Sequence, residues 1–295
     1  MRFIKEGTHI DFIGKRKIAL FLSLSLIIVG LIFFFKRGEE NLGVDFSGGT
    51  LIQLEFEKEI SIESIRQSLK EINLGKSTIQ RFGQGKEIII RTQAETERII
   101  FEKIRQDYSG NPFLHKRTEM VGPAVGKDLR KKGLLALIFS FLGIGIYVSI
   151  RFEFEYAVGA VIALIHDILI TLGACAVTGR EITLPVLAAF LALIGYSIND
   201  TIVVYDRIRE DLRLMRKENF ETIINTSINQ TLSRTLLTTV TTLLAVVALF
   251  IWGGEVIHDF AFILMVGIIT GTYSSVFVAS PLIVEWRRRK RRKSG

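Results

Sequence analysis

The residues most able to do chemistry in this sequence are ionisable side chains placed inside apolar stretches. Asn199 and Asp200 interrupt the apolar part of GYSINDTIVVYDRIRE, Arg234 lies early in a second apolar stretch, and Asp167 follows His166 midway along a third. A charge inside a bilayer costs at least ~2.5 to 3.5 kcal/mol, so such groups normally face a bundle interior or a water path and have a partner. Titratable groups at this depth are what a path for protons across a membrane requires, and the predicted proton-path residues are Asp200, Arg234, Asp167 and Asn199.

Asp200 and Arg234 are expected to form a pair between neighbouring helices. Asp200 lies about 7.5 Å of helix before the end of its apolar stretch, and Arg234 lies at a comparable depth in the next one. A counter-charge would lower the cost of burying Asp200 while leaving it able to exchange protons. Three structural alternatives stay open: Arg234 extends to the interface, Asp200 hydrogen-bonds to an adjacent helix, and Asp167 with His166 forms a satisfied packing pair.

The elements that must position these residues are membrane-spanning helices. Of the 295 residues 48% are apolar, which is high for one soluble core of this size. Runs of roughly 18 or more apolar residues are long enough to cross a ~30 Å hydrocarbon layer. Six such runs occur: residues 18–35, 133–150, 156–178, 184–205, 232–252 and 260–284.

Charge asymmetry predicts the orientation of these spans, because Lys and Arg near span ends favour the cytoplasmic side. Basic residues cluster before span one, after span four and in the tail RRRKRRK, whereas the loops GREI and GGEVIHD are nearly free of them. Both termini are therefore expected in the cytoplasm. The basic residues of the first two clusters are Arg2, Lys5, Lys15, Arg16 and Lys17, and Arg207, Arg209, Arg213, Arg216 and Lys217.

The stretch between spans one and two is the only one long enough for a domain outside the membrane. TLIQLEFE, STIQRF, KEIIIRT and FLHKRTEMVGP are typical of strands, with a turn GQGK, while SIESIRQSLKEI and ETERIIFEKIRQDY have helical spacing. The order β-α-β-β-α-β favours a ferredoxin-like domain. We therefore predict an N-terminus and first span (1–35), a periplasmic α+β domain (36–132), spans two to six (133–284) and a basic cytoplasmic tail (285–295).

Sequence motifs of enzymes and cofactor sites are not found. LGKST lacks the first glycine of a phosphate-binding loop, and there is no zinc-protease motif or nucleophile elbow. Cys175 is the single cysteine, so the chain has no internal disulfide or cysteine-based zinc site. GVDFSGGT is interpreted as a structural turn that enters the first strand. We expect no enzyme, no cofactor and no nucleic-acid partner. The basic tail is expected to bind anionic lipid, and binding of that tail to nucleic acid or a ribosome is the alternative that stays open.

Six motifs together resemble the SecF members of the SecD/SecF family, within the RND superfamily. They are GVDFSGGT, VGPAVGKDLRKKG, IHDI, GYSINDTIVVYDRIRE, TLSRTLLTT and GTYSSVFVASPL, in the family's order along the chain. The resemblance implies an auxiliary subunit of the bacterial Sec protein translocase in the cytoplasmic membrane. It implies use of the proton-motive force to complete export of secreted polypeptides, and it matches Asp200 and Arg234 to the family's proton-path residues.

The resemblance also implies two protein partners, a SecD-like six-span subunit and the Sec translocation channel. The distribution of charged residues also favours a partner subunit, because six helices with charges confined to spans three to five resemble half of a two-fold bundle. The other half is expected from another polypeptide. Two alternatives remain: a stand-alone RND-type proton-coupled transporter of small apolar solutes, and a membrane scaffold. An outer domain of about 97 residues leaves little space for a solute pocket, and a scaffold needs neither Asp200 nor Arg234.

Overall fold

The computed structural model describes residues 9–82, 86–92 and 96–294, and it divides into two compact units. One unit joins residues 1–41 to residues 135–295, and the other comprises residues 42–134. Each is described by itself. The basic residues Arg2 and Lys5 and most of the predicted turn GQGK lie outside the described residues.

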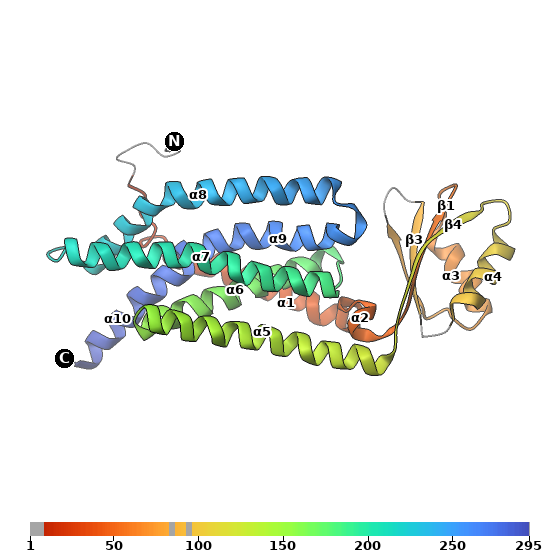
Figure 1. The fold of residues 1–295 in the computed structure, drawn as a ribbon, viewed down its shortest axis with the longest axis horizontal. Helices are drawn as coiled ribbons and strands as arrows, with labels where there is room; N and C mark the ends of the chain where they lie inside the picture. The colour runs from red at the N-terminus through yellow and green to blue at the C-terminus, as the bar shows by residue number, and fades with distance from the viewer. Residues whose placement is uncertain (1–8, 83–85, 93–95, 295) are drawn as a thin grey trace. The chain divides into compact units, whose positions relative to one another are not determined.

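The first unit is built from long helices (Figure 1). Six of them are long and apolar enough to cross a membrane, which confirms the six-span prediction. They are α1 (Arg16–Arg37), α5 (Pro123–Arg151), α6 (Phe154–Thr178), α7 (Leu184–Leu214), α8 (Phe220–Trp252) and a final run of α9 (Gly254–Ser274), a π-helical turn (Ser275–Ala279) and α10 (Ser280–Ser294).

Helices α7 and α8 are longer than their apolar runs, because both continue into the polar segment that joins them. Asn219 begins α8 and accepts a hydrogen bond from the backbone N–H of Glu221 at 2.8 Å. At the opposite end of α7, the Thr183 side chain accepts from the N–H of Val186. Each cap satisfies an N–H that the first helical turn leaves without a partner. The two helices are thereby joined by residues 215–219 alone.

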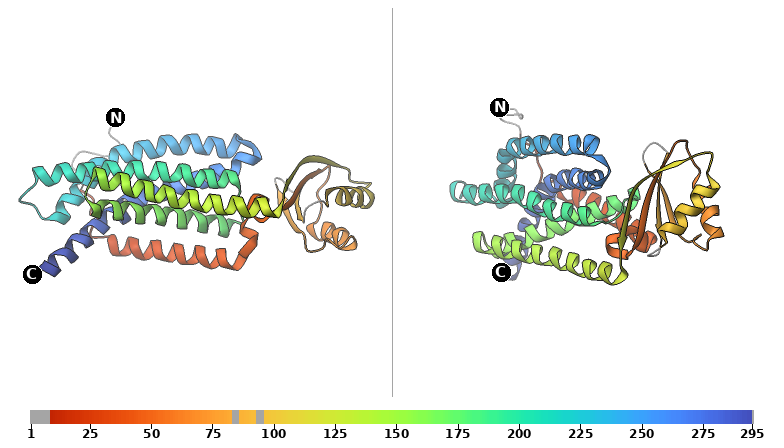
Figure 2. Two further views of the ribbon diagram at one scale, coloured as in Figure 1. Left: turned by 60° about the horizontal axis from the view of Figure 1, so that its bottom comes forward. Right: turned by 45° about the vertical axis from the view of Figure 1, so that its right-hand side comes forward.

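Helix α1 packs against α6 (Figure 2), and the contact depends on a pair of glycines. A Cβ added at Gly30 would lie 2.6 Å from the Cα of Gly173, closer than real atoms approach. Small residues allow the backbones of membrane helices to meet in this way. Ser23 lies seven residues before Gly30, and His166 lies seven residues before Gly173. Two turns of each helix therefore separate the glycine contact from these two polar side chains.

The last span is interrupted by a π-helical turn that the apolar pattern did not predict. The turn covers Ser275–Ala279, and the Ser280 hydroxyl donates to the carbonyl oxygen of Ser275 at 2.8 Å. Pro281 follows at once, and a proline inside a helix removes one backbone hydrogen bond and crowds the carbonyl four residues earlier. A wider turn relieves that crowding.

The second unit contains an antiparallel sheet with strand order β2-β3-β1-β4. Helices α3 and α4 cover one face of it (Figure 1). This is the ferredoxin-like arrangement, so the predicted element order and fold class are confirmed. The elements are β1 (Gly49–Phe56), α3 (Ile62–Glu71), β2 (Thr78–Phe82), β3 (Glu87–Thr92), α4 (Glu97–Asp107) and β4 (Phe113–Val121).

The core of this unit lies between the helices and the sheet. Ile52 and Leu54 of β1, Ile65 of α3 and Ile100 of α4 are all fully buried there. The predicted Ser cap of the first helix forms, since the Ser61 side chain accepts from the N–H of Ser64. Alternating strand residues and the helical stripes thus meet on one apolar face.

GVDFSGGT folds as a single helical turn, α2 (Val44–Ser47), followed by two glycines that lead into β1. Gly48 has φ of +75° and Gly49 has φ of +117°, a backbone region that side chains with a Cβ rarely adopt. A Cβ at Gly49 would also lie 2.5 Å from the carbonyl oxygen of Thr92. The glycines therefore have a structural role here, in agreement with the predicted turn.

Candidate functional site in the membrane bundle

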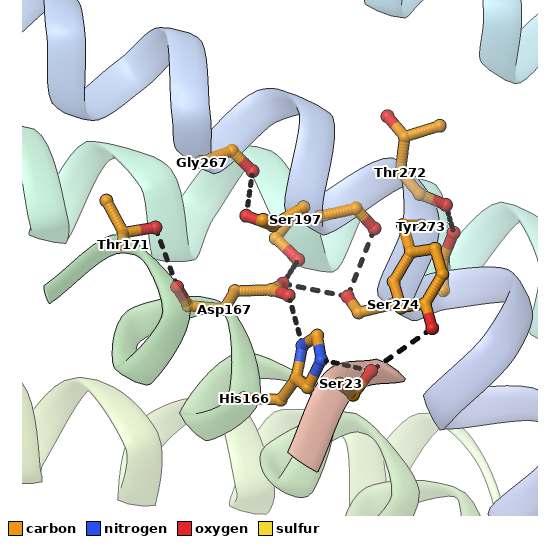
Figure 3. Close-up of polar contacts among 12 residues, drawn as sticks. Ser23, His166, Asp167, Thr171, Ser197, Gly267, Thr272, Tyr273 and Ser274 are labelled. Atoms are coloured by element: carbon orange, nitrogen blue, oxygen red, sulfur yellow. Dashed lines mark hydrogen bonds and ion pairs between the residues drawn. The ribbon is translucent and has the colours of Figure 1, made fainter. Parts of the chain in front are cut away.

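Asp167 lies in a buried polar pocket between α6, α7 and α9 (Figure 3). The carboxylate is 1% exposed. Its Oδ2 accepts from the Ser197 hydroxyl at 2.6 Å and from the Ser274 hydroxyl at 2.8 Å, and its Oδ1 lies 3.0 Å from Nδ1 of His166. Hydrogen bonds from three side chains satisfy a carboxylate that would otherwise be costly to bury.

The pocket continues through His166 to the first helix. Nε2 of His166 lies 3.0 Å from the Ser23 hydroxyl of α1. Ser23 in turn lies 3.1 Å from the Tyr273 hydroxyl of α9, which donates to the carbonyl oxygen of Ala19 at 2.7 Å. Figure 3 shows Ser23, His166 and Asp167 in one line of contacts. A continuous chain of hydrogen bonds thus joins α1, α6, α7 and α9.

Asp200 occupies a second, less complete site on α7. It is 3% exposed, and its Oδ2 has no hydrogen-bond partner among the described residues. The hydroxyls of Thr272 of α9 and Thr239 of α8 lie 2.7 Å apart, and the Thr272 hydroxyl donates to the carbonyl oxygen of Ile268 in its own helix. Ser197, which donates to Asp167, precedes Asp200 by one helical turn. The two carboxylate sites therefore share one face of α7.

The predicted direct pair between Asp200 and Arg234 is not present in the structure. No ion pair or hydrogen bond joins the two side chains, and Arg234 makes no ion pair with any described residue. The reason is the orientation of α8, whose inward face is formed by the buried Thr235 and Thr239. Arg234 precedes Thr235, so it is rotated off that face and its side chain is exposed.

Asn199 also lies apart from the polar pocket. It is exposed on α7, on a different side of the helix from the buried Asp200. Of the four predicted proton-path residues, the structure therefore buries Asp167 and Asp200 and leaves Asn199 and Arg234 on the surface of the single chain. Their role in moving protons stays a prediction.

Sequence reasoning missed the hydroxyl groups that build both sites. Ser197 precedes Asp200 by one helical turn, and Tyr273 and Ser274 belong to the cluster GTYSS in the last span. Hydroxyls clustered in an apolar span are a signal for polar contacts between helices. Ser23 offers no such signal, because a serine in a membrane helix can bond to its own backbone.

Metal and thiol chemistry have no candidate site in the part of the chain that the structure describes. No group of three or more His, Cys, Asp or Glu side chains there is arranged to hold a metal ion. Cys175 is a free, buried cysteine that packs with Phe190 and Val186. Its surroundings are those of a small apolar core residue.

Two family models match the sequence. Residues 100–289 match the C-terminal region of the protein export membrane proteins SecD/SecF, and residues 41–60 match the SecD/SecF GG motif. The second match covers the paired glycines Gly48 and Gly49, whose positive φ angles are described above. The matched regions include every residue of the two carboxylate sites except Ser23 and Ala19 of α1.

Curated relatives and a solved structure are similar over nearly the whole chain. A protein translocase subunit SecF of Magnetococcus marinus is 46% identical over 99% of this chain and 97% of its own length. The SecF of Calditerrivibrio nitroreducens is 45% identical over 96% of each chain. The crystal structure of SecDF from Thermus thermophilus, described as a translocon-associated membrane protein, aligns with a TM-score of 0.88 and 36% identity. It covers 96% of this chain, which spans 39% of that longer one.

Proposed function

Because the chain belongs to the SecD/SecF family of protein export membrane proteins, we propose that it is the SecF-type subunit of a Sec protein translocase. The resemblance expected from its motifs is confirmed. In this proposal the chain works with a SecD-like subunit and the translocation channel. It uses the proton-motive force to complete the passage of secreted polypeptides.

The observation that carries the proposal is the state of Asp200. It is a buried carboxylate inside a membrane span, yet one of its oxygens has no hydrogen-bond partner among the described residues. A structural carboxylate at this depth would be expected to have its hydrogen bonds complete, as Asp167 does. A free oxygen instead leaves room for a proton or for a water molecule that delivers one. Asp200 is therefore the proton-exchanging group of the proposed mechanism.

The exposed polar residues support a partner subunit. Arg234 and Asn199 lie on the surface of α8 and α7 inside their spans, where contact with lipid would be costly. A second protein that covers this surface would remove that cost and enclose the Asp200 site. The solved SecDF chain is much longer than this one, which spans 39% of it. We propose that a SecD-like chain supplies the covering surface.

Arg234 would then act as a fixed positive charge beside the proton site. When Asp200 is ionised, the charge of Arg234 stabilises it without a direct ion pair. When a proton arrives, that attraction is lost, and the helices that carry the two groups are free to shift. A change in helix packing on each cycle would be passed to the domain outside the membrane.

The proposed orientation places both termini and residues 206–231 in the cytoplasm. It rests on the basic residues around these segments and on the positive-inside rule. A cysteine introduced at Lys217 in a Cys175→Ser background tests this in intact cells. Protection from a membrane-impermeant thiol reagent is expected, and labelling from outside would contradict the topology.

The test of the function is export of a secretory protein into inverted membrane vesicles, with ATP supplied and the proton gradient present or collapsed. Asp200→Asn keeps the size of the side chain and removes its titration, so the response to the gradient should be lost. Arg234→Met should lose it as well, because without the positive charge Asp200 is held in its neutral form. The double variant should be no worse than either single one, because the same step has already stopped.

Asp206→Asn is the matched control. Asp206 lies on the same helix, but it is half exposed and pairs with Arg151 at 2.8 Å. The control should respond to the gradient as wild type does. Copurification with a SecD-like chain must be equal in all variants, and its failure in wild type would favour the stand-alone transporter. A full response in Asp200→Asn at normal complex levels would make the carboxylate structural and the proposal wrong.

A further inference from the structure

The hydrogen bonds around His166 have a fixed direction, and that direction has a consequence for protons. Four hydrogen bonds run in a chain from the carbonyl oxygen of Ala19 through Tyr273, Ser23 and His166 to Oδ1 of Asp167. A carbonyl oxygen can only accept, so the Tyr273 hydroxyl must donate to Ala19. Its single hydrogen is then used.

Each following bond is determined by the one before it. Because Tyr273 has no second hydrogen, Ser23 must donate to the Tyr273 oxygen. The Ser23 hydrogen is then used as well, so Nε2 of His166 must carry a hydrogen and donate to Ser23. A neutral imidazole has one N–H, and here it is on Nε2. Nδ1 is therefore left without a hydrogen unless the ring is charged.

The last bond needs a proton that a neutral histidine and an ionised aspartate do not have together. Nδ1 of His166 and Oδ1 of Asp167 lie 3.0 Å apart. Either Nδ1 carries the proton, which gives an imidazolium beside a carboxylate, or Oδ1 carries it, which gives a neutral pair. The other carboxylate oxygen is occupied by Ser197 and Ser274, and the Ser274 hydrogen is shared with the carbonyl oxygen of Gly271 at 3.1 Å.

We infer that the His166–Asp167 pair holds one proton, and that its release removes the hydrogen bond between these two side chains while the bonds that attach α1 to the bundle remain. Without that proton, three hydrogens remain for the four bonds of the chain. Two of these bonds join Ser23 to α6 and α9, and a third joins Ala19 to α9. The pair is a proton-holding site separate from Asp200.

The surroundings of the pair isolate this proton from other charges. Among the described residues, its hydrogen-bond partners from α1, α7 and α9 are the neutral Ser23, Ser197 and Ser274. Tyr273 is the one further titratable group in contact, and its ring stacks on His166 with centroids 6.0 Å apart. Both members of the pair are nearly inaccessible to solvent. The position of the proton is therefore determined by the hydrogen bonds of this chain and not by a neighbouring charge.

The role of this proton in export rests on the proposed function, but its presence is tested without any export assay. The measurement is nitrogen NMR of ¹⁵N-histidine in the purified full chain in lipid nanodiscs, with the His166 signals identified by their loss in His166→Gln. Hydrogen is expected on Nε2 of His166 throughout the pH range in which the chain is folded, and the Nδ1 signal should move to that of a bare ring nitrogen when the pair loses its proton at high pH. An Nδ1 signal of a bare ring nitrogen at every pH would mean that the pair holds no proton. A neutral ring with hydrogen on Nδ1 and none on Nε2 would overturn the inference.

Two variants and one control test the direction of the chain. Ser23→Ala removes the acceptor of Nε2–H, so the hydrogen should move to Nδ1 and donate to Asp167. Asp167→Asn can donate to Nδ1 from its amide and accept from both serines, so Nε2–H should persist at every pH. Ser25→Ala is the control on α1, because Ser25 bonds only to the Phe21 carbonyl of its own helix, and it should change nothing.

The outcomes separate this inference from the proposed function. Loss of the gradient response in Asp200→Asn, together with a neutral His166 ring that carries hydrogen on Nδ1 alone in wild type, would retain the proton function and reject the second site. The expected NMR result with an unaffected Asp200→Asn would retain the proton-holding pair and reject the proposed path. An unchanged His166 spectrum in Ser23→Ala would reject the chain of bonds itself.

Discussion

Asp167 and Asp200 are both aspartates buried in membrane spans, yet their surroundings differ. Asp167 accepts hydrogen bonds from α7 and α9 and contacts His166 of its own helix. Asp200 has a buried carboxylate oxygen without a hydrogen-bond partner among the described residues. Burial alone therefore does not distinguish these two carboxylate sites. The number of satisfied oxygens does, because it determines how much structure depends on the charge.

The largest expected effect on stability is that of Asp167→Ala. It leaves Ser197, Ser274 and His166 without a shared acceptor in a buried pocket, at roughly 1 kcal/mol for each group, or about 3 kcal/mol in total. Unfolding of the purified chain in mixed micelles by increasing SDS measures this. Asp167→Asn retains the hydrogen bonds and should lose much less. Equal losses in the two variants would show that the charge, rather than the hydrogen bonding, stabilises the pocket.

A second variant breaks the Asp167 pocket from a distance. Gly30→Val places a side chain against the backbone of Gly173, so α1 must move away and Ser23 must separate from His166. Overpacking of this kind costs about 1 to 3 kcal/mol. Gly143→Val on α5 is the control, because nothing lies within 4 Å of a Cβ added there. A normal melt of Gly30→Val in the same SDS titration would mean that the close approach is not needed.

Asp200→Asn should change stability by less than about 1 kcal/mol, because at most one hydrogen bond is altered. The same variant is expected to remove the gradient response, so its effect on export should be large although its effect on stability is small. The SDS titration and the export assay are run on the same preparations. A loss comparable to that of Asp167→Ala would place Asp200 among the structural carboxylates and remove the contrast between the two sites.

The smallest effect on stability is expected at Asp107, an exposed carboxylate outside the membrane spans. It can be compared with the two buried aspartates, Asp167 and Asp200. A hydrogen bond from Lys103 lowers the pKa of Asp107 below its ordinary value, with a smaller contribution from Ser68. The stabilisation is therefore present above the ordinary aspartate pKa and is lost as pH falls through the lowered one. Carbon NMR of the Asp107 carboxylate in the full chain measures that pKa.

Lys103→Gln is the variant that tests the cause. It removes the ammonium that donates to Asp107 at 2.8 Å, so the Asp107 pKa should return toward its ordinary value. The melting temperature should hardly change, because exposed ion pairs contribute little. An Asp107 pKa that stays low in Lys103→Gln would assign the shift to Ser68 instead.

Local patterns in the sequence were enough to predict the elements of this protein. Six apolar runs predicted six spans, because an 18-residue apolar helix has few other places to lie. Alternating residues and a Ser cap predicted the ferredoxin-like order, and the two glycines predicted the turn into β1. Asp167, Asp200 and Arg234 could also be identified inside the spans from sequence alone. Each is an ionisable residue in an apolar run, where burying a charge in lipid costs free energy.

Tertiary structure alone decided which groups meet. Asp200 and Arg234 have similar depth in the sequence pattern, but depth does not specify rotation about a helix axis, and α8 turns Thr235 and Thr239 inward in place of Arg234. The link from Ser23 to His166 depends on the approach of two glycines 143 residues apart, and the same separation divides the two polar residues. Such contacts arise from packing between helices, and the spacing of residues within one helix does not predict them.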